Sequence, residues 1–117
     1  MQSLKKYLSQ YYYSMPLTDS LKYNKLIVIT PSGVIMGSPI SNDEMSNDAN
    51  LLATLSLNCV KEYREKNSLE PSQQLDGNDG FITLKNVTLQ TGEATFNFAV
   101  LNVFYDQIVA ITVGNPE

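Results

Sequence analysis

The side chains that most often carry catalysis are scarce in this chain of 117 residues. There is no histidine, so the usual general base of serine and cysteine hydrolases is missing, as is the commonest metal ligand. Glu62 and Glu65 are close together in a predicted helix, but basic residues flank them, which indicates a solvated face rather than an acid–base pair. No glycine-rich phosphate loop occurs. The sequence therefore predicts a protein that is not an enzyme and needs no cofactor.

One acidic loop has residue types that could bind a metal ion. Its sequence, Asp-Gly-Asn-Asp-Gly over Asp76–Gly80, is similar to part of a calcium-binding loop. The spacing of the acidic residues is wrong, however, and Val87 stands where such a loop needs its last glutamate. Cys59 is the single cysteine, so no internal disulfide can form. We expect a solvated turn here and no metal site.

Composition favours one globular domain over residues 1–117. Hydrophobic residues make up 43% of the chain and charged residues 17%, which is too apolar for a disordered protein. The net charge of −4 means that the chain as a whole does not attract nucleic acid. The longest aliphatic run, Leu26–Ile29, is far shorter than the roughly 20 residues of a membrane span, and no secretion signal or lipid-anchor motif is recognisable. We therefore expect a cytoplasmic protein without membrane contact.

Two segments have the apolar spacing that is typical of helices. Residues 1–15 predict an N-terminal helix capped by Ser3, with an apolar face made of Leu4, Tyr7, Leu8, Tyr11 and Tyr12. This face is expected to lie on the core; alternatively, the tyrosines form a stacking or subunit surface. Residues 47 to about 67 predict a second helix, whose apolar face is expected to cover a sheet: Leu51, Leu52, Leu55, Cys59, Val60 and Tyr63.

The remaining segments have the composition of strands. Residues 25–30 and 34–37 flank a Pro-Ser-Gly turn and predict a hairpin, in which Gly37 marks a bulge or a sharp bend. Three more strands are predicted over residues 81–90, 95–105 and 108–113. The apolar residues of the second of these change faces half-way along, as in a strand that bends across a barrel. The sequence thus predicts a mainly β fold with two helices, built on a five-stranded, strongly bent antiparallel β-barrel.

Three segments match, in order, the motifs of a known family. Leu26–Gly37 is similar to the opening hairpin of Sm-like proteins, with an aliphatic strand, a turn glycine and a second glycine. Asp79–Val87 has the order Asp, any residue, aromatic, aliphatic, polar, Leu, Lys-Asn, which resembles the entry to the third strand of the bacterial Hfq branch. Val103–Ile111 falls at the second family motif. The chain therefore resembles the Sm/LSm-like small β-barrels, and its acidity and inserted helix resemble those of divergent phage-borne members.

The resemblance implies a base-binding site in the pore of a ring. In the family an aromatic residue stacks on a base and neighbouring polar residues contact the base edge, and such stacking is worth about 1–3 kcal/mol per base. The residues implied for this role are Asp79, Phe81, Thr83, Tyr105, Asp106 and Gln107. The alternative for Phe81 is an ordinary place in the barrel core. A second Asp-x-apolar-x-Asn pattern occurs over Asp43–Asn47, although Asn47 is better explained as a helix cap.

The resemblance also implies assembly and a function. Edge strands 94–101 and 108–113 would pair between copies and close a homo-oligomeric ring of about five to seven subunits. We expect such a ring to bind single-stranded RNA or DNA without catalysis, with a role in RNA or DNA processing. The acidic surface and the replacement of the second motif's cation by Asp106-Gln107 favour a structural or protein-interaction ring instead. A second departure from the family is the insertion over residues 38–78, which would lie over one face of the barrel or obstruct or replace the RNA loop. A third interpretation is a monomeric β-domain whose tyrosine-rich helix binds a partner.

Overall fold

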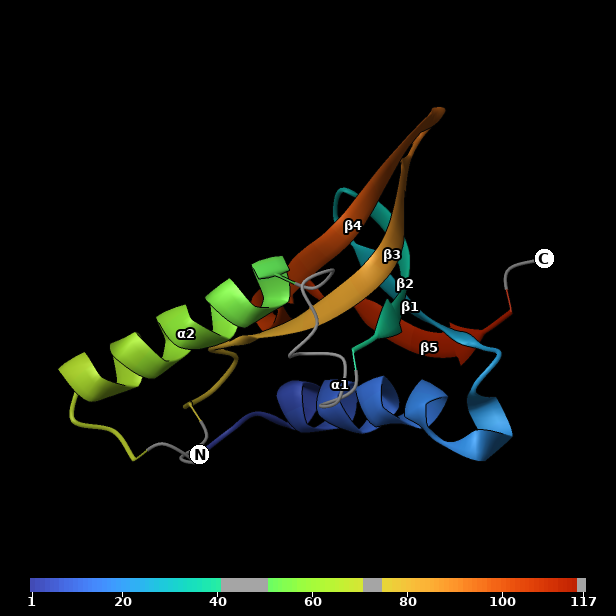
Figure 1. The fold of residues 1–117 in the computed structure, drawn as a ribbon. Coiled ribbons are helices and arrows are strands. Elements are labelled where there is room, and N and C mark those ends of the chain that lie inside the picture. The colour runs from blue at the N-terminus through green and yellow to red at the C-terminus, as the bar shows by residue number, and fades with distance from the viewer. Residues whose placement is uncertain (41–50, 71–74, 116–117) are drawn as a thin grey trace.

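In the computed structural model, which describes residues 1–40, 51–70 and 75–115, the chain forms one antiparallel sheet and two α-helices (Figure 1). The five strands are β1 (Lys25–Thr30), β2 (Gly33–Pro39), β3 (Phe81–Thr91), β4 (Ala94–Phe104) and β5 (Ala110–Gly114). The α-helices are α1 (Leu4–Ser14) and α2 (Leu51–Lys66), and 3₁₀ helices span Met15–Leu17, Asp19–Leu21 and Tyr105–Gln107. The mainly β architecture, with α2 inserted between β2 and β3, is the one that the sequence predicts.

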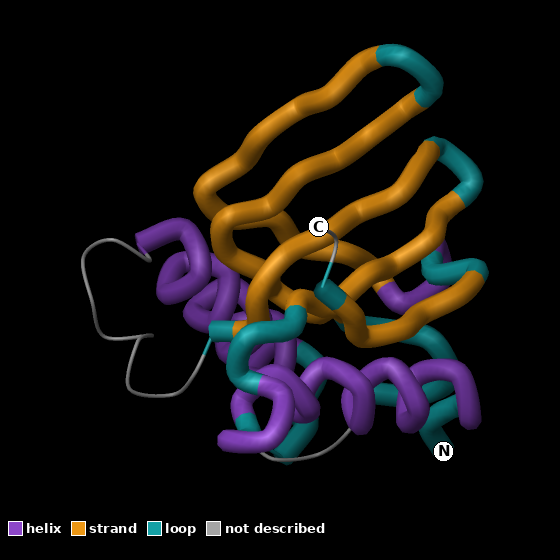
Figure 2. The backbone as a smooth tube through the Cα atoms, turned by 90° about the vertical axis from the view of Figure 1, so that its right-hand side faces the viewer, coloured by secondary structure: helices purple, strands orange, loops and turns teal. Residues whose placement is uncertain are grey.

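The sheet is open at both sides. Its strand order is β4-β3-β2-β1-β5, so the two outer strands are β4 and β5. In the described chain these two strands pair only with β3 and β1 respectively, and the predicted barrel is therefore not closed. The strands are strongly curved (Figure 2), as the sequence predicts. A change of apolar faces along a strand indicates such curvature, but it does not determine whether the outer strands meet.

A bulge bends the sheet at the place that Gly37 indicates. The register of β2 against β3 shifts by one residue there, and Asn86 of β3 adopts a left-handed conformation with φ 52°. A Cβ added to Gly37 would lie 3.1 Å from the Cβ of Leu84, so the absence of a side chain permits the close approach of the two strands. Leu84 and Val87 consequently both enter the core, although they stand an odd number of positions apart.

The edge strand β4 follows the same change of faces. Its Leu101 pairs with Leu84 and its Phe98 pairs with Val87, so both residues lie on the core side of the sheet. This pairing confirms that the apolar residues of the segment change faces half-way. The outer half of the β3–β4 hairpin extends away from the rest of the sheet (Figure 1), which leaves Phe98 39% exposed.

The core lies on one face of the sheet and includes residues from the 3₁₀ turn that precedes β5. Its buried members are Leu26, Val28, Ile35, Ile82, Leu84, Val87, Val103, Tyr105 and Ile108. Ile108 is only 2% exposed, and β5 begins two residues later. Two boundaries of the predicted strands 95–105 and 108–113 are therefore wrong. Tyr105 belongs to the 3₁₀ turn rather than to the end of β4, and Ile108 is a core residue that precedes β5.

Helix α1 contacts β5 and the Tyr105–Gln107 turn, and it runs below the sheet in Figure 1. Ser3 caps it as predicted, because its side chain accepts a hydrogen bond from the backbone N–H of Lys6. The predicted core face is wrong: the buried residues of the helix are Lys6 and Ser9. The apolar residues that are exposed instead are Leu4, Tyr7, Leu8 and Tyr11. Of the predicted face, Tyr12 does pack against the core, as does its neighbour Tyr13.

Helix α2 lies beside β3 and β4 (Figure 1). The Nδ2 of Asn102 in β4 donates a hydrogen bond of 2.9 Å to the Oγ of Ser56, and Ala53 is the buried residue of the helix. The leucine-rich face does not cover a sheet, since its members Leu51, Leu52, Leu55, Cys59 and Tyr63 are exposed. The predicted start of this helix at residues 47–50 and the second pattern over 43–47 lie outside the described residues. Among the helices that the structure describes, none has the length and apolarity to cross a membrane.

Candidate functional site

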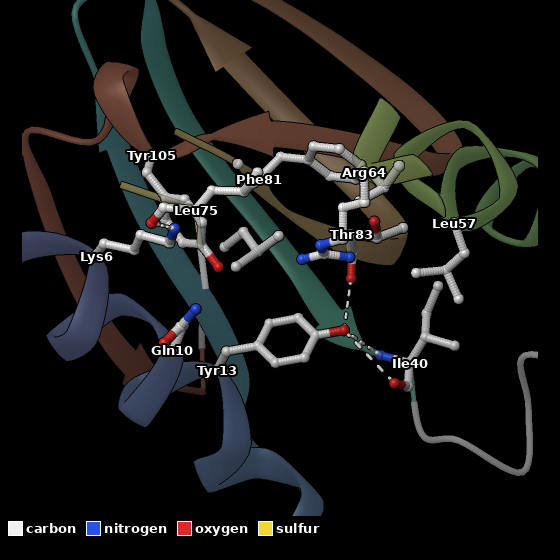
Figure 3. Close-up of a pocket in the computed structure, with 13 residues that line it drawn as sticks. Lys6, Gln10, Tyr13, Ile40, Leu57, Arg64, Leu75, Phe81, Thr83 and Tyr105 are labelled. Carbon is white, nitrogen blue, oxygen red and sulfur yellow. Dashed lines mark hydrogen bonds between the residues drawn. The ribbon is translucent and has the colours of Figure 1, made fainter. Parts of the chain in front are cut away.

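A cavity of about 390 Å³ opens where α1, α2 and the beginning of β3 come together (Figure 3). Both helices contribute side chains, and β2 contributes the residue that follows it, Ile40. Thirteen residues line the cavity: Lys6, Gln10, Tyr13, Ile40, Leu57, Val60, Arg64, Leu75, Gly80, Phe81, Ile82, Thr83 and Tyr105. The volume falls in the range of about 300–1,000 Å³ that is usual for small-molecule sites.

The structure brings half of the predicted site residues together at this cavity. Phe81, Thr83 and Tyr105 line it. Asp79 is exposed in the loop before β3, and Asp106 and Gln107 are exposed in the 3₁₀ turn, so none of these three is among the lining residues. The cavity belongs to a single copy of the chain, whereas the predicted pore would need several copies.

Phe81 is the aromatic residue of the cavity that is best placed for stacking. It alternates along β3 with the buried Ile82, so its ring lies on the opposite side of the sheet from the core. The ring is half-buried and meets Phe104 of β4 edge to face, with centroids 5.5 Å apart and an interplanar angle of 67°. Phe81 is not a member of the buried core, which was the alternative role that its sequence allowed.

Thr83 is held in place by two hydrogen bonds. Its hydroxyl donates to the Oδ1 of Asn102 at 2.8 Å, and its carbonyl accepts from the hydroxyl of Tyr13 at 2.8 Å. The same Tyr13 hydroxyl accepts from the backbone N–H of Ile40 at 3.0 Å (Figure 3). Tyr13 therefore joins α1 to the end of β2 and to β3, which fixes one wall of the cavity.

Lys6 is a buried cation at the cavity. Its side chain is only 2% exposed, its Nζ donates to the carbonyl of Leu75 at 2.6 Å, and the same Nζ lies 5.6 Å from the centre of the Tyr105 ring. Burial lowers the pKa of Lys6 below its usual value; the nearby carboxylate of Asp79 partly offsets this effect, and the charge of Arg64 adds to it. Within the described part of the chain, the ammonium thus has a backbone carbonyl and an aromatic ring as its close contacts.

Arg64 is the second cation of the cavity, and it enters from α2 (Figure 3). It is half-buried, and its buried Nε has no hydrogen-bond partner among the described residues. The charge pattern around Glu62 and Glu65 predicts a solvated face for this stretch of the helix, which is wrong for Arg64. Arg64 follows Leu57 and Val60 at helical spacing, and these three residues mark the face of α2 that lines the cavity.

Tyr105 closes the cavity from the side of the 3₁₀ turn. Its backbone N–H donates to the carbonyl of Gly80 at 3.1 Å, and a Cβ on Gly80 would lie 3.1 Å from its ring. Burial raises the pKa of the Tyr105 phenol, and a hydrogen bond with Gln10 partly offsets the increase. Tyr105 is therefore a packed wall of the cavity rather than an exposed pore residue.

The described residues include no group of three or more His, Cys, Asp or Glu side chains that could hold a metal ion. Comparisons of the chain with protein-family models, curated proteins and solved structures find no match. The cavity itself combines a half-buried aromatic ring, two cations and hydrogen-bonding groups that helices and strands hold in place. Aromatic rings and cations placed together are suited to a nucleotide, which offers a flat base and a phosphate.

Proposed function

We propose that this protein is a non-catalytic, Sm-like ring protein that binds single-stranded RNA or DNA. The observation that carries the proposal is the position of Phe81, half-buried at a cavity that also holds Lys6 and Arg64. An aromatic ring gives sequence-tolerant stacking with any base, and adjacent cations attract the backbone. The net charge of −4 disfavours nucleic acid, but the two cations give the cavity itself a positive charge.

The proposed ring rests on the two free edges of the sheet. In the part of the chain that the structure describes, β4 and β5 each have one edge without a neighbouring strand, and such edges favour pairing with another chain. On β4 the core-side residues Phe96 and Phe98 are 49% and 39% exposed, with no described element over them. β5 carries no charged residue. Pairing of β4 with β5 of the next copy would cover both phenylalanines and continue the core from one copy to the next.

The arrangement of elements adds support for the Sm-like type. An N-terminal helix precedes five strongly curved antiparallel strands, and the outer strands of the sheet are the fourth and fifth in the sequence. These are the features that the resemblance implies for the family. The wide insertion between β2 and β3 remains the main departure from it.

The first experiment measures the mass in solution by size-exclusion chromatography with light scattering. The wild type is expected as a closed oligomer of about five to seven copies. Phe96→Lys places a charge in the proposed interface and should reduce the mass towards 13.0 kDa, whereas Tyr23→Lys, at an exposed aromatic residue outside the five strands, should not. A wild-type monomer at micromolar concentration would exclude the ring.

The second experiment measures binding of fluorescent oligo-U and oligo-A by anisotropy at low and moderate salt. Phe81→Ala should weaken binding by about 5- to 150-fold, the value of one stacked base. Tyr23→Ala removes an exposed aromatic ring elsewhere and should leave the affinity unchanged. Retention of the oligomer by Phe81→Ala shows that the loss is local. Equal affinity of Phe81→Ala and wild type would contradict the assignment of Phe81.

A protein-interaction ring is the second candidate function. The specific observation in its favour is that both helices turn apolar residues to solvent, among them Tyr7 and Tyr11 of α1 and Leu51 and Leu55 of α2. If this second function is correct, light scattering should still show an oligomer, and anisotropy should show no binding of oligo-U or oligo-A at tens of micromolar protein.

A further inference from the structure

We propose that the inserted helix α2 supplies the phosphate contact of the nucleic-acid site, with Arg64 holding the phosphate of the nucleotide whose base stacks on Phe81 and the buried ammonium of Lys6 adding its charge. The inference rests on the proposed function and assigns to the insertion a part in it. Sequence similarity points to no such role, because the insertion is the segment in which this chain departs from the family that it resembles.

Both cations line the same cavity, and none of its described lining residues is a carboxylate. Burial is the main cause of the lowered pKa of Lys6, and the positive charge of Arg64 adds a smaller contribution in the same direction. Asp79, which acts in the opposite direction, lies outside the cavity wall. Two like charges in a partly enclosed space favour a bound anion, because an anion removes the repulsion and compensates for the lost hydration of both groups.

Arg64 is the group with spare hydrogen-bonding capacity. Lys6 already donates to the carbonyl of Leu75, whereas the buried Nε of Arg64 has no partner among the described residues. A guanidinium offers two parallel N–H donors in the geometry of a phosphate, so it binds such a group more specifically than an ammonium does. An anion bound here would therefore satisfy a donor that the described chain leaves without a hydrogen bond.

The position of Phe81 distinguishes a nucleotide from a simple anion. Phe81 and Arg64 line the same cavity, one from β3 and one from α2 (Figure 3). A ligand that uses both groups needs an aromatic plane and a phosphate within one small unit. A nucleotide of a single strand meets this requirement, and an acidic peptide meets only the second half of it.

The family motif that would supply the cation is replaced here by the exposed pair Asp106-Gln107. Arg64 thus performs, from an added helix, the electrostatic task that the turn after β4 cannot perform. The rotation of α2 that buries Ala53 also places Arg64 at the cavity.

The test compares Arg64→Gln with Lys66→Gln, which removes the same charge from an exposed position of the same helix. Binding of labelled oligo-U is measured by anisotropy from low to moderate salt. Arg64→Gln should weaken binding about tenfold, as expected for one lost charge-assisted hydrogen bond. It should also reduce the slope of log K against log salt by about 0.7, the value for one phosphate contact of a single strand. Lys66→Gln should change the affinity less than about twofold.

The outcomes separate the two proposals. If the wild type binds and Phe81→Ala weakens binding, but Arg64→Gln keeps the wild-type affinity and salt slope, the role of α2 is wrong and the proposed function stands. If the wild type binds neither oligo-U nor oligo-A, both proposals fail. An unchanged thermal midpoint of Arg64→Gln excludes misfolding, and Arg64→Lys should restore part of the salt slope because it restores the charge. Binding of a fluorescent acidic peptide that is lost in Arg64→Gln, with no binding of oligo-U, would replace the nucleotide by a protein ligand.

Discussion

The hydroxyl of Tyr13 should stabilise the fold more than its size suggests. It donates to the carbonyl of Thr83 at 2.8 Å and accepts from the backbone N–H of Ile40 at 3.0 Å. Tyr13→Phe keeps the ring and removes both bonds. A hydrogen bond contributes about 0.5–1.5 kcal/mol, and a buried N–H without a partner costs about 1–3 kcal/mol. Ile40 is buried, so we expect the free energy of unfolding to fall by about 2–3 kcal/mol.

The matched control for this change is Tyr11→Phe. Tyr11 lies on the same helix and is 60% exposed, so the loss of its hydroxyl should change the stability by less than about 0.5 kcal/mol. Urea denaturation of the three proteins at one protein concentration gives the comparison, because assembly would otherwise shift the midpoints by mass action. In a thermal scan, a midpoint about 8 °C or more below that of the wild type corresponds to the same loss. Equal stabilities of Tyr13→Phe and Tyr11→Phe would refute the proposed link between α1, β2 and β3.

Two further changes test the bend of the sheet and the buried phenol. Gly37→Ala should destabilise the fold by about 1–3 kcal/mol in urea denaturation, because its Cβ would lie 3.1 Å from the Cβ of Leu84; a stability equal to that of the wild type would show that the bulge can relax. Burial raises the pKa of Tyr105, so the folded protein keeps the phenol proton to a higher pH than the unfolded chain does. The stability that the neutral phenol contributes is complete below about pH 10 and is lost as the pH rises through the raised pKa. Between about pH 9 and 11.5, the free energy of unfolding should therefore fall less for Tyr105→Phe than for the wild type. The lowered pKa of Lys6 has the opposite effect on stability, but it is present in both proteins. An equal fall in both proteins would contradict a buried Tyr105 phenol with a raised pKa.

The strands of this fold could be predicted because their signals are local. The β-branched run of β1, the turn at Gly33 and the change of faces along β4 each depend on neighbouring residues, and the structure confirms them. The order of the strands in the sheet and the openness of its edges depend on contacts between distant segments. Periodicity carries no information about such contacts.

The faces of both helices were predicted wrongly for one physical reason. The prediction assigns the most apolar face to the core, but the sheet surface that α2 approaches carries Thr83 and Asn102, and a small, partly polar helix face fits it better. Ser56 and Ala53 therefore point inward in place of the leucines. α1 likewise buries Lys6 rather than its tyrosine-rich face, since Leu75 provides a carbonyl for the ammonium.

The cavity was predicted only in part. Phe81, Thr83 and Tyr105 could be found because they belong to short segments with a recognisable order. Lys6 and Arg64 come from two helices far apart in the chain, and each is an ordinary surface residue by its local sequence. Only the fold brings the two cations together, so the feature that gives the cavity its charge could not be predicted from neighbouring residues.

The bulge between β2 and β3 has a consequence beyond the single chain. In a head-to-tail series of copies joined edge to edge, each copy turns the next by a constant angle, and that angle is set by how sharply the sheet is folded at Gly37 and Asn86. If the rotations between successive copies add up to one full turn, the assembly closes into a ring. If they do not, copies continue to add and an open filament forms. The geometry of two residues inside the sheet would thus decide between a small, soluble particle and a fibre.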